Sequence, residues 1–229
     1  MTDGNWFAEG NYAVALMNRG AFEEAEPHLR SAIEIGPARH GDYVNLGYML
    51  SSTGRLSEAA KALETAVDLN PERAVPWMLL GSARLGTGDS QGAIAAFDKG
   101  LALDPTNANA RANLGVAYGM SGDTGSARAQ FERVLVRWPE HAEALYNYGA
   151  MEARLGNNAP ARELLERLVT AHPGRGDGWY ALAALDAIEG RVEDATEKLR
   201  RAIGVDASYE SRWASDPVFD AVRRAGARP

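Results

Sequence analysis

Cysteine is absent from the 229 residues of the sequence. Disulfides and thiolate metal sites are therefore excluded, and this composition is typical of a protein from a reducing compartment. No apolar run reaches the roughly 20 residues that a membrane-spanning helix needs. The first residues also lack the basic segment and apolar run of a secretory signal, so we expect a cytoplasmic protein that does not insert into membranes.

Lysine is scarce as well, so that arginine carries almost all of the basic charge. The formal net charge is -7, and the only lysines are Lys61, Lys99 and Lys198. Binding of a nucleic acid requires a concentrated basic surface, because every phosphate in the backbone is negatively charged. The sequence contains no long basic run, so we expect no nucleic-acid partner.

What the sequence does contain is a constant period, in which a glycine is followed by an alanine at a fixed spacing. The pairs are Gly20 and Ala25, Gly54 and Ala59, Gly88 and Ala93, Gly122 and Ala127, Gly156 and Ala161, and Gly190 and Ala195. A proline stands at one fixed distance after each of the first five glycines, at Pro37, Pro71, Pro105, Pro139 and Pro173. Self-similarity at such a period predicts an array of stacked units rather than one central core.

The period divides the chain into a short N-terminal extension, residues 1–5, and six units of equal length. The units are 6–39, 40–73, 74–107, 108–141, 142–175 and 176–209. Each unit carries two helical patterns, which we call its first and second helix. The glycine between them suits a left-handed turn, an aspartate such as Asp89 or Asp123 can cap the second helix, and the proline ends it.

The third unit shows most clearly that these units resemble tetratricopeptide repeats, through Trp77, Leu80, Gly81, Gly88, Ala93, Phe97 and Pro105. The resemblance covers residues 6–209. It implies an all-α fold, a right-handed superhelical solenoid of six tandem helix-turn-helix repeats. Three residues depart from the family pattern at the eleventh place, Arg84, Glu152 and Asp186, and there we expect looser packing between helices. Pro27 should cost the second helix of the first unit one backbone bond or kink it locally.

Residues 210–229 read as a degenerate seventh unit followed by a capping helix. Trp213 stands where Trp77 stands in its unit, and Pro217 then ends the register. The run after Pro217 places Val218, Phe219 and Val222 on one side of a helix. An array needs such a cap, because its last hydrophobic face would otherwise meet water.

The sequence offers no catalytic or metal-binding constellation. His28, His40, His141 and His172 lie on different units without paired ligand spacing, and no serine, histidine and acid combination suggests a nucleophile. The repeat columns leave no room for a catalytic domain. We therefore expect a protein that is not an enzyme and that uses no metal and no cofactor.

In the resembled family, the first helices line the concave side and bind protein or peptide partners. The matching places here are mostly apolar or aromatic and nearly uncharged. The candidate groove residues are Asn11, Met17, Asn45, Tyr48, Met78, Leu85, Asn113, Met120, Tyr146, Asn147 and Tyr180. Relatives that grip acidic C-termini carry lysine and arginine where this chain has Gly10, Val44, Val75 and Met78, so that clamp is absent.

Four asparagines, Asn11, Asn45, Asn113 and Asn147, share the sixth place of their units. An amide can pair with both the N–H and the C=O of a peptide backbone, although these side chains could instead bond locally. The leading hypothesis is a scaffold whose groove binds an apolar or amphipathic protein segment. Two alternatives stay open: a homo-oligomer formed through Trp213, Phe219 and Val222, and a small apolar ligand held among the methionines.

Overall fold

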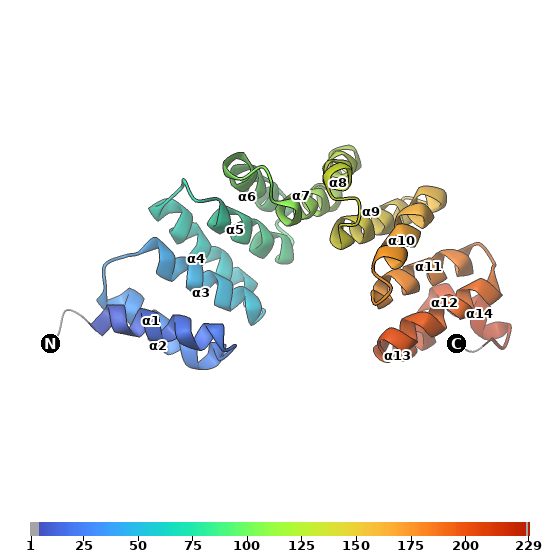
Figure 1. Cartoon of the computed structure of the whole chain (residues 1–229), viewed down its shortest axis with the longest axis horizontal. Helices are drawn as coiled ribbons and strands as arrows, with labels where there is room; N and C mark the ends of the chain where they lie inside the picture. The colour runs from blue at the N-terminus through green and yellow to red at the C-terminus, as the bar shows by residue number, and fades with distance from the viewer. Residues whose placement is uncertain (1–4, 228) are drawn as a thin grey trace. The chain divides into compact units, whose positions relative to one another are not determined.

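The computed structural model describes residues 5–227 and residue 229, and within them every regular element is a helix. This confirms the predicted all-α class. Helices follow one another as antiparallel hairpins (Figure 1). The chain divides into two compact units, residues 1–127 (unit 1) and residues 128–229 (unit 2), and the boundary falls inside one helix.

Unit 1 contains three helical hairpins and the first helix of a fourth. Its helices are α1 (Asn5–Asn18), α2 (Phe22–Ile35), α3 (His40–Ser52), α4 (Leu56–Leu69), α5 (Ala74–Gly86), α6 (Ser90–Leu103) and α7 (Ala108–Ser121). The first helix of each hairpin packs closely on the second. α2 remains continuous through Pro27, whose ring is exposed.

The boundary helix is α8 (Thr124–Arg137), and unit 2 continues from it. Its further helices are α9 (Ala142–Arg154), α10 (Asn158–Ala171), α11 (Gly176–Ile188), α12 (Val192–Val205) and α13 (Ser208–Ser215), then the 3₁₀ turn η1 (Pro217–Phe219) and α14 (Asp220–Arg224). Two hairpin helices overlap each of the repeat windows predicted from the sequence, although α1 begins at Asn5, before the first window, and α13 begins at Ser208, inside the last one.

The turn inside each hairpin depends on the glycine that defines the period. Gly88 has φ of +84°, a left-handed conformation that a side chain would strain. The backbone N–H of Asp89 returns to the carbonyl of Arg84 at 2.9 Å, which closes the end of α5. The Asp89 carboxylate then accepts from the N–H of Gly92 at 2.9 Å, which confirms the predicted cap of α6.

The alanine of each pair lies where the two helices of a hairpin come closest. All six, Ala25, Ala59, Ala93, Ala127, Ala161 and Ala195, are completely buried. Gly81, the eighth residue of its unit, is small for the same reason: a Cβ added to it would lie 2.8 Å from the Phe97 ring. Small residues are therefore required where large side chains of the second helix fill the seam.

The eleventh-place charges do not loosen the packing, contrary to the sequence-based expectation. The Glu152 side chain is buried and accepts three hydrogen bonds from Arg128, one from Nε at 2.9 Å and two from Nη2 at 2.7 and 2.9 Å, and a fourth from Asn157 at 2.7 Å. In unit 1, Arg84 donates to Glu64 at 2.8 Å. In both pairs the partner comes from the second helix of the preceding repeat, so the charge links adjacent hairpins.

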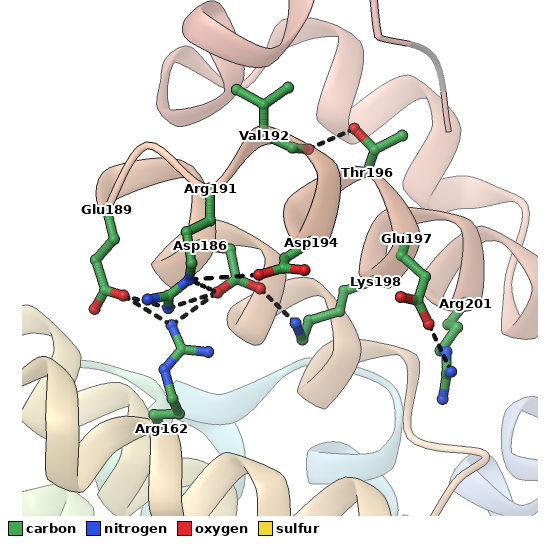
Figure 2. Close-up of polar contacts among 10 residues, drawn as sticks. All are labelled: Arg162, Asp186, Glu189, Arg191, Val192, Asp194, Thr196, Glu197, Lys198 and Arg201. Atoms are coloured by element: carbon green, nitrogen blue, oxygen red, sulfur yellow. Dashed lines mark hydrogen bonds and ion pairs between the residues drawn. The ribbon is translucent and has the colours of Figure 1, made fainter.

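Asp186 has the most extensive of these networks (Figure 2). Its side chain is completely buried at the end of α11, and Oδ1 lies 2.8 Å from Arg162 Nη2 and 2.7 Å from Arg191 Nη2. Oδ2 lies 2.5 Å from Lys198 Nζ. Burial alone would raise the pKa of Asp186, but the hydrogen bonds from Lys198 and Arg191 outweigh it and hold the pKa below its ordinary value.

The predicted capping helix is divided into η1 and α14. Phe219 and Val222 are both completely buried against α11 and α12. The Tyr180 hydroxyl donates to Asp216 at 2.8 Å, and Asp216 also accepts from the N–H of Val218 at 3.1 Å. These contacts cover the last hydrophobic face of the array, as an end cap must.

Candidate functional site

The first helices of unit 1 form one layer. α1 contacts α3, α3 contacts α5, and α5 contacts α7, whereas α2, α4 and α6 make at most marginal contact with one another. The hairpins are therefore closer together on the side of the first helices, which makes this side the inner face of unit 1. In unit 2, α9 and α11 are in contact in the same way.

The candidate residues on the inner face of unit 1 differ in accessibility. Tyr48 and Met120 are the most open of the large side chains, with exposed fractions of 48% and 50%. Asn11 is exposed, while Met17, Asn45, Leu85 and Asn113 are half-buried. Met78 differs from the expectation, because only 8% of it is exposed and it packs in the core with Phe97 and Leu114.

The sixth-place amides have no hydrogen-bond partner among the described residues. Across residues 5–227 and 229, the side chains of Asn11, Asn45, Asn113 and Asn147 make no hydrogen bond to another protein group. The alternative that these amides only bond locally is therefore not realised in the structure. Each keeps both its donor and its acceptor for a partner.

A hollow of about 560 Å³ opens on this face between the N-terminal ends of α3 and α5. Its lining combines apolar, amide and charged groups: His40, Gly41, Val44, Asn45, Glu72, Arg73, Ala74, Val75 and Pro76. His40 is fixed by a hydrogen bond between Nδ1 and the carbonyl of Ala66 at 3.0 Å, and a carbonyl only accepts, so Nδ1 carries the proton. Gly41 has open space where a Cβ would stand.

Sequence reasoning missed His40 and Arg73, because it considered only the face of the helices and judged the groove nearly uncharged. Arg73 occupies the last place of its unit, just before a first helix. The same place holds Arg39, Asn107, His141 and Arg175 in other units. Comparing the last residue of each unit, together with the residues that follow it, would have identified the charge of Arg73.

The inner face of unit 2 is more polar than predicted. Tyr146 and Asn147 are half-buried on α9, and the Arg175 guanidinium lies 5.7 Å from the centre of the Tyr146 ring. Arg175 is neutralised by Asp177 at 2.6 Å and Glu143 at 2.7 Å. Burial raises the pKa of the Tyr146 hydroxyl, so it stays protonated at neutral pH and can donate a hydrogen bond.

Tyr180 also differs from the expectation, since only 5% of it is exposed. It is covered by the capping segment, with its ring 5.3 Å from that of Phe219 and the Arg212 guanidinium 4.5 Å above it. Burial and the hydrogen bond to Asp216 raise its pKa. Tyr180 therefore fixes the cap to α11 and leaves little surface for a ligand.

The residues behind the two alternative hypotheses are engaged inside the chain. Phe219 and Val222 are buried and Trp213 packs against the same cluster, so self-assembly through them would require the cap to detach. Met17 and Met78 belong to different core clusters.

Among residues 5–227 and 229, no group of three or more histidine, aspartate or glutamate side chains is arranged to hold a metal ion. No helix within the described residues has the length and apolar character needed to cross a bilayer.

Comparison with known structures agrees with this geometry. The chain is similar to PilW, a widely conserved type IV pilus biogenesis factor, with a TM-score of 0.71 and 16% identity over 96% of this chain and 97% of that one. A tetratricopeptide repeat protein from Parabacteroides merdae gives a TM-score of 0.74 and 16% identity over 97% and 92%. YrrB, described as having an unusual peptide-binding site, gives 0.59 and 21% over 86% and 97%. At these identities the likeness establishes the fold alone.

Comparison of the sequence with family profiles is more specific. One tetratricopeptide repeat profile matches residues 45–108, 112–176 and 153–211, and a second matches residues 84–135. No curated protein matches the sequence. The matched segments span most of the chain and coincide with the helical hairpins and the turns at Gly88, Gly122 and Gly156. The chain therefore belongs to the tetratricopeptide repeat family.

Proposed function

We propose that the protein is a non-enzymatic scaffold whose first-helix face binds an apolar or amphipathic peptide segment. The family to which it belongs is a protein-interaction fold, and one structural relative, YrrB, is described as having a peptide-binding site. The proposal rests on two features that occur on the same helix layer of unit 1, exposed apolar side chains and unbonded amides. Tyr48 and Met120 are half exposed on the same layer as the unbonded amides of Asn45 and Asn113.

The physical argument concerns both parts of a peptide. Adjacent helices pack roughly 10 Å apart, which is the length of about three residues of extended chain. The amides of Asn11 and Asn45, on the successive first helices α1 and α3, can therefore pair with backbone groups about three residues apart, whereas α5, with Leu79 at its sixth place, separates Asn45 from Asn113. Tyr48 follows Asn45 on α3 and Met120 follows Asn113 on α7, and both offer apolar area to the peptide side chains.

We expect a random peptide display library to yield binders of the intact protein that are rich in apolar residues. The affinity of a selected peptide should fall by roughly tenfold or more in Tyr48→Glu and in Met120→Glu, because each change places a charge against an apolar partner. Isothermal titration calorimetry measures the difference.

The matched control is Leu69→Glu, which changes an apolar residue of α4 that is 43% exposed away from the first-helix layer. Its peptide affinity should equal that of the wild type. Equal weakening by Leu69→Glu, or no weakening by either inner-face variant, would show that the peptide does not bind this face. Thermal melting of each variant separates lost binding from lost folding.

A further inference from the structure

The hollow between α3 and α5 contains an arginine whose equivalents elsewhere in the chain are always paired. Arg39 and Arg175 occupy the same place in their repeats as Arg73. Arg39 donates to both oxygens of Asp42, at 2.7 and 2.7 Å. Arg175 donates to both oxygens of Asp177, at 2.9 and 2.6 Å. In each case a carboxylate from the following first helix receives a bidentate pair.

The repeat that follows Arg73 provides no such carboxylate. Its second and third residues are Val75 and Pro76, where the corresponding acids elsewhere are Asp177 and Asp42. Within the described residues, Arg73 forms no ion pair and donates no side-chain hydrogen bond. Arg73 is exposed and lines the hollow, and its guanidinium donors are not engaged by any residue that the structure describes.

The remaining lining defines what fits beside a carboxylate. Val75 is 59% exposed and Val44 lies opposite on α3, so the hollow offers apolar contact on both sides. The Asn45 amide is available for a peptide backbone. Glu72 also lines the hollow, and its negative charge opposes a doubly charged group such as phosphate.

We propose that this hollow binds the side-chain carboxylate of an aspartate or glutamate, flanked by apolar residues, in a peptide held on the first-helix face. The bound carboxylate takes the role at Arg73 that Asp42 takes at Arg39 and Asp177 takes at Arg175. The inference deepens the proposed function, on which it rests, by naming an acidic residue as a determinant of specificity.

The test uses the full chain and three small probes. These are the N-acetylated, C-amidated peptides Leu-Asp-Leu and Leu-Asn-Leu, and N-acetyl-leucine, which presents a terminal carboxylate instead of a side chain. Nuclear magnetic resonance titrations follow the amides of Gly41 and Val75 and the Nε–H of Arg73. We expect saturable shifts with Leu-Asp-Leu, at an affinity about tenfold or more above that of either other probe.

Two variants assign the effect to Arg73. Arg73→Gln should weaken Leu-Asp-Leu binding by about tenfold or more, while Arg19→Gln, the same change at an exposed residue without side-chain contacts in the structure, should leave it unchanged. Val75→Asp installs an internal acid at the place of Asp177 and should abolish probe binding with Arg73 still present. Thermal melting and the backbone spectrum show that each variant is folded.

Equal binding of the aspartate and asparagine peptides, unchanged binding in Arg73→Gln, or preference for N-acetyl-leucine would overturn the inference. Its failure differs from a failure of the proposed function. If display-selected peptides depend on Tyr48 and Met120 but not on Arg73, the scaffold function stands and the carboxylate site falls. If the aspartate probe binds while the affinity of selected peptides does not depend on Tyr48 and Met120, the carboxylate site stands and the scaffold function falls.

Discussion

Replacing Asp186 by asparagine should destabilise the C-terminal hairpin of unit 2. The carboxylate is completely buried and lies between the cations of Arg162, Arg191 and Lys198, from α10, the α11–α12 turn and α12 (Figure 2). Breaking a buried ion pair costs about 3 to 5 kcal/mol in general. Asparagine keeps an oxygen that can accept from the two arginines, and the cations are 21% to 41% exposed. We therefore expect a loss of about 2 to 3 kcal/mol.

Hydrogen–deuterium exchange of α11 and α12 measures this loss locally. A change of about 2 to 3 kcal/mol accelerates exchange by roughly 30- to 160-fold where exchange follows opening of the hairpin. Asp194→Asn is the matched control: it removes the same charge from a partner of the same Arg191, but Asp194 is 56% exposed and its contact is 3.7 Å long. That variant should exchange within a factor of about two of the wild type.

Two results would refute the reasoning. Unchanged exchange in Asp186→Asn would show that the network adds no stability, and equal acceleration by Asp194→Asn would show that burial does not decide the effect. A third variant, Asp186→Leu, removes every acceptor at once. It should exchange faster than Asp186→Asn, because three cations then lose their common partner.

Three further predictions concern pH, the turn and the cap. Because the folded pKa of Asp186 lies below its ordinary value of 3.8, its stabilisation is present above about pH 4 and is lost as the pH falls further, so acid unfolding of unit 2 should be less steep in Asp186→Asn than in the wild type. Gly88→Ala meets no atom within 4 Å but must keep φ of +84°, so urea unfolding should show a loss of about 1 to 2 kcal/mol; a neutral result would mean that the turn can change its conformation. Phe219→Ala should cost about 3 to 5 kcal/mol and expose Tyr180, which near-ultraviolet circular dichroism reports. An unchanged near-ultraviolet spectrum would contradict the role of the cap in covering Tyr180.

Much of the fold could be predicted from sequence because its determinants are local. A left-handed glycine such as Gly88 and a small residue such as Ala93 act on the hairpin that contains them, so their constant period places the helices and turns. The inner face followed from the same register, and Tyr48 and Met120 are accessible there. Their role in binding remains a prediction.

What could not be predicted depends on residues from elsewhere in the chain. From the sequence alone, Glu152 is an unpaired charge at a packing position. Only the structure shows that Arg128 of the preceding hairpin neutralises it. The sequence places Tyr180 in the groove, because the cap that covers it does not obey the repeat pattern and could not be positioned from the period. Arg73 becomes notable only because the acids that neutralise its equivalents are missing from the next helix.

The most direct test of the account is chemical-shift mapping of a display-selected peptide on the intact, isotope-labelled protein. We predict that the perturbed amides of unit 1 lie on α3, α5 and α7, with Asn45 and Asn113 side-chain amides among them. Perturbations confined to α2, α4 and α6, or to the cap around Phe219, would contradict the claim that the first-helix face is the binding surface.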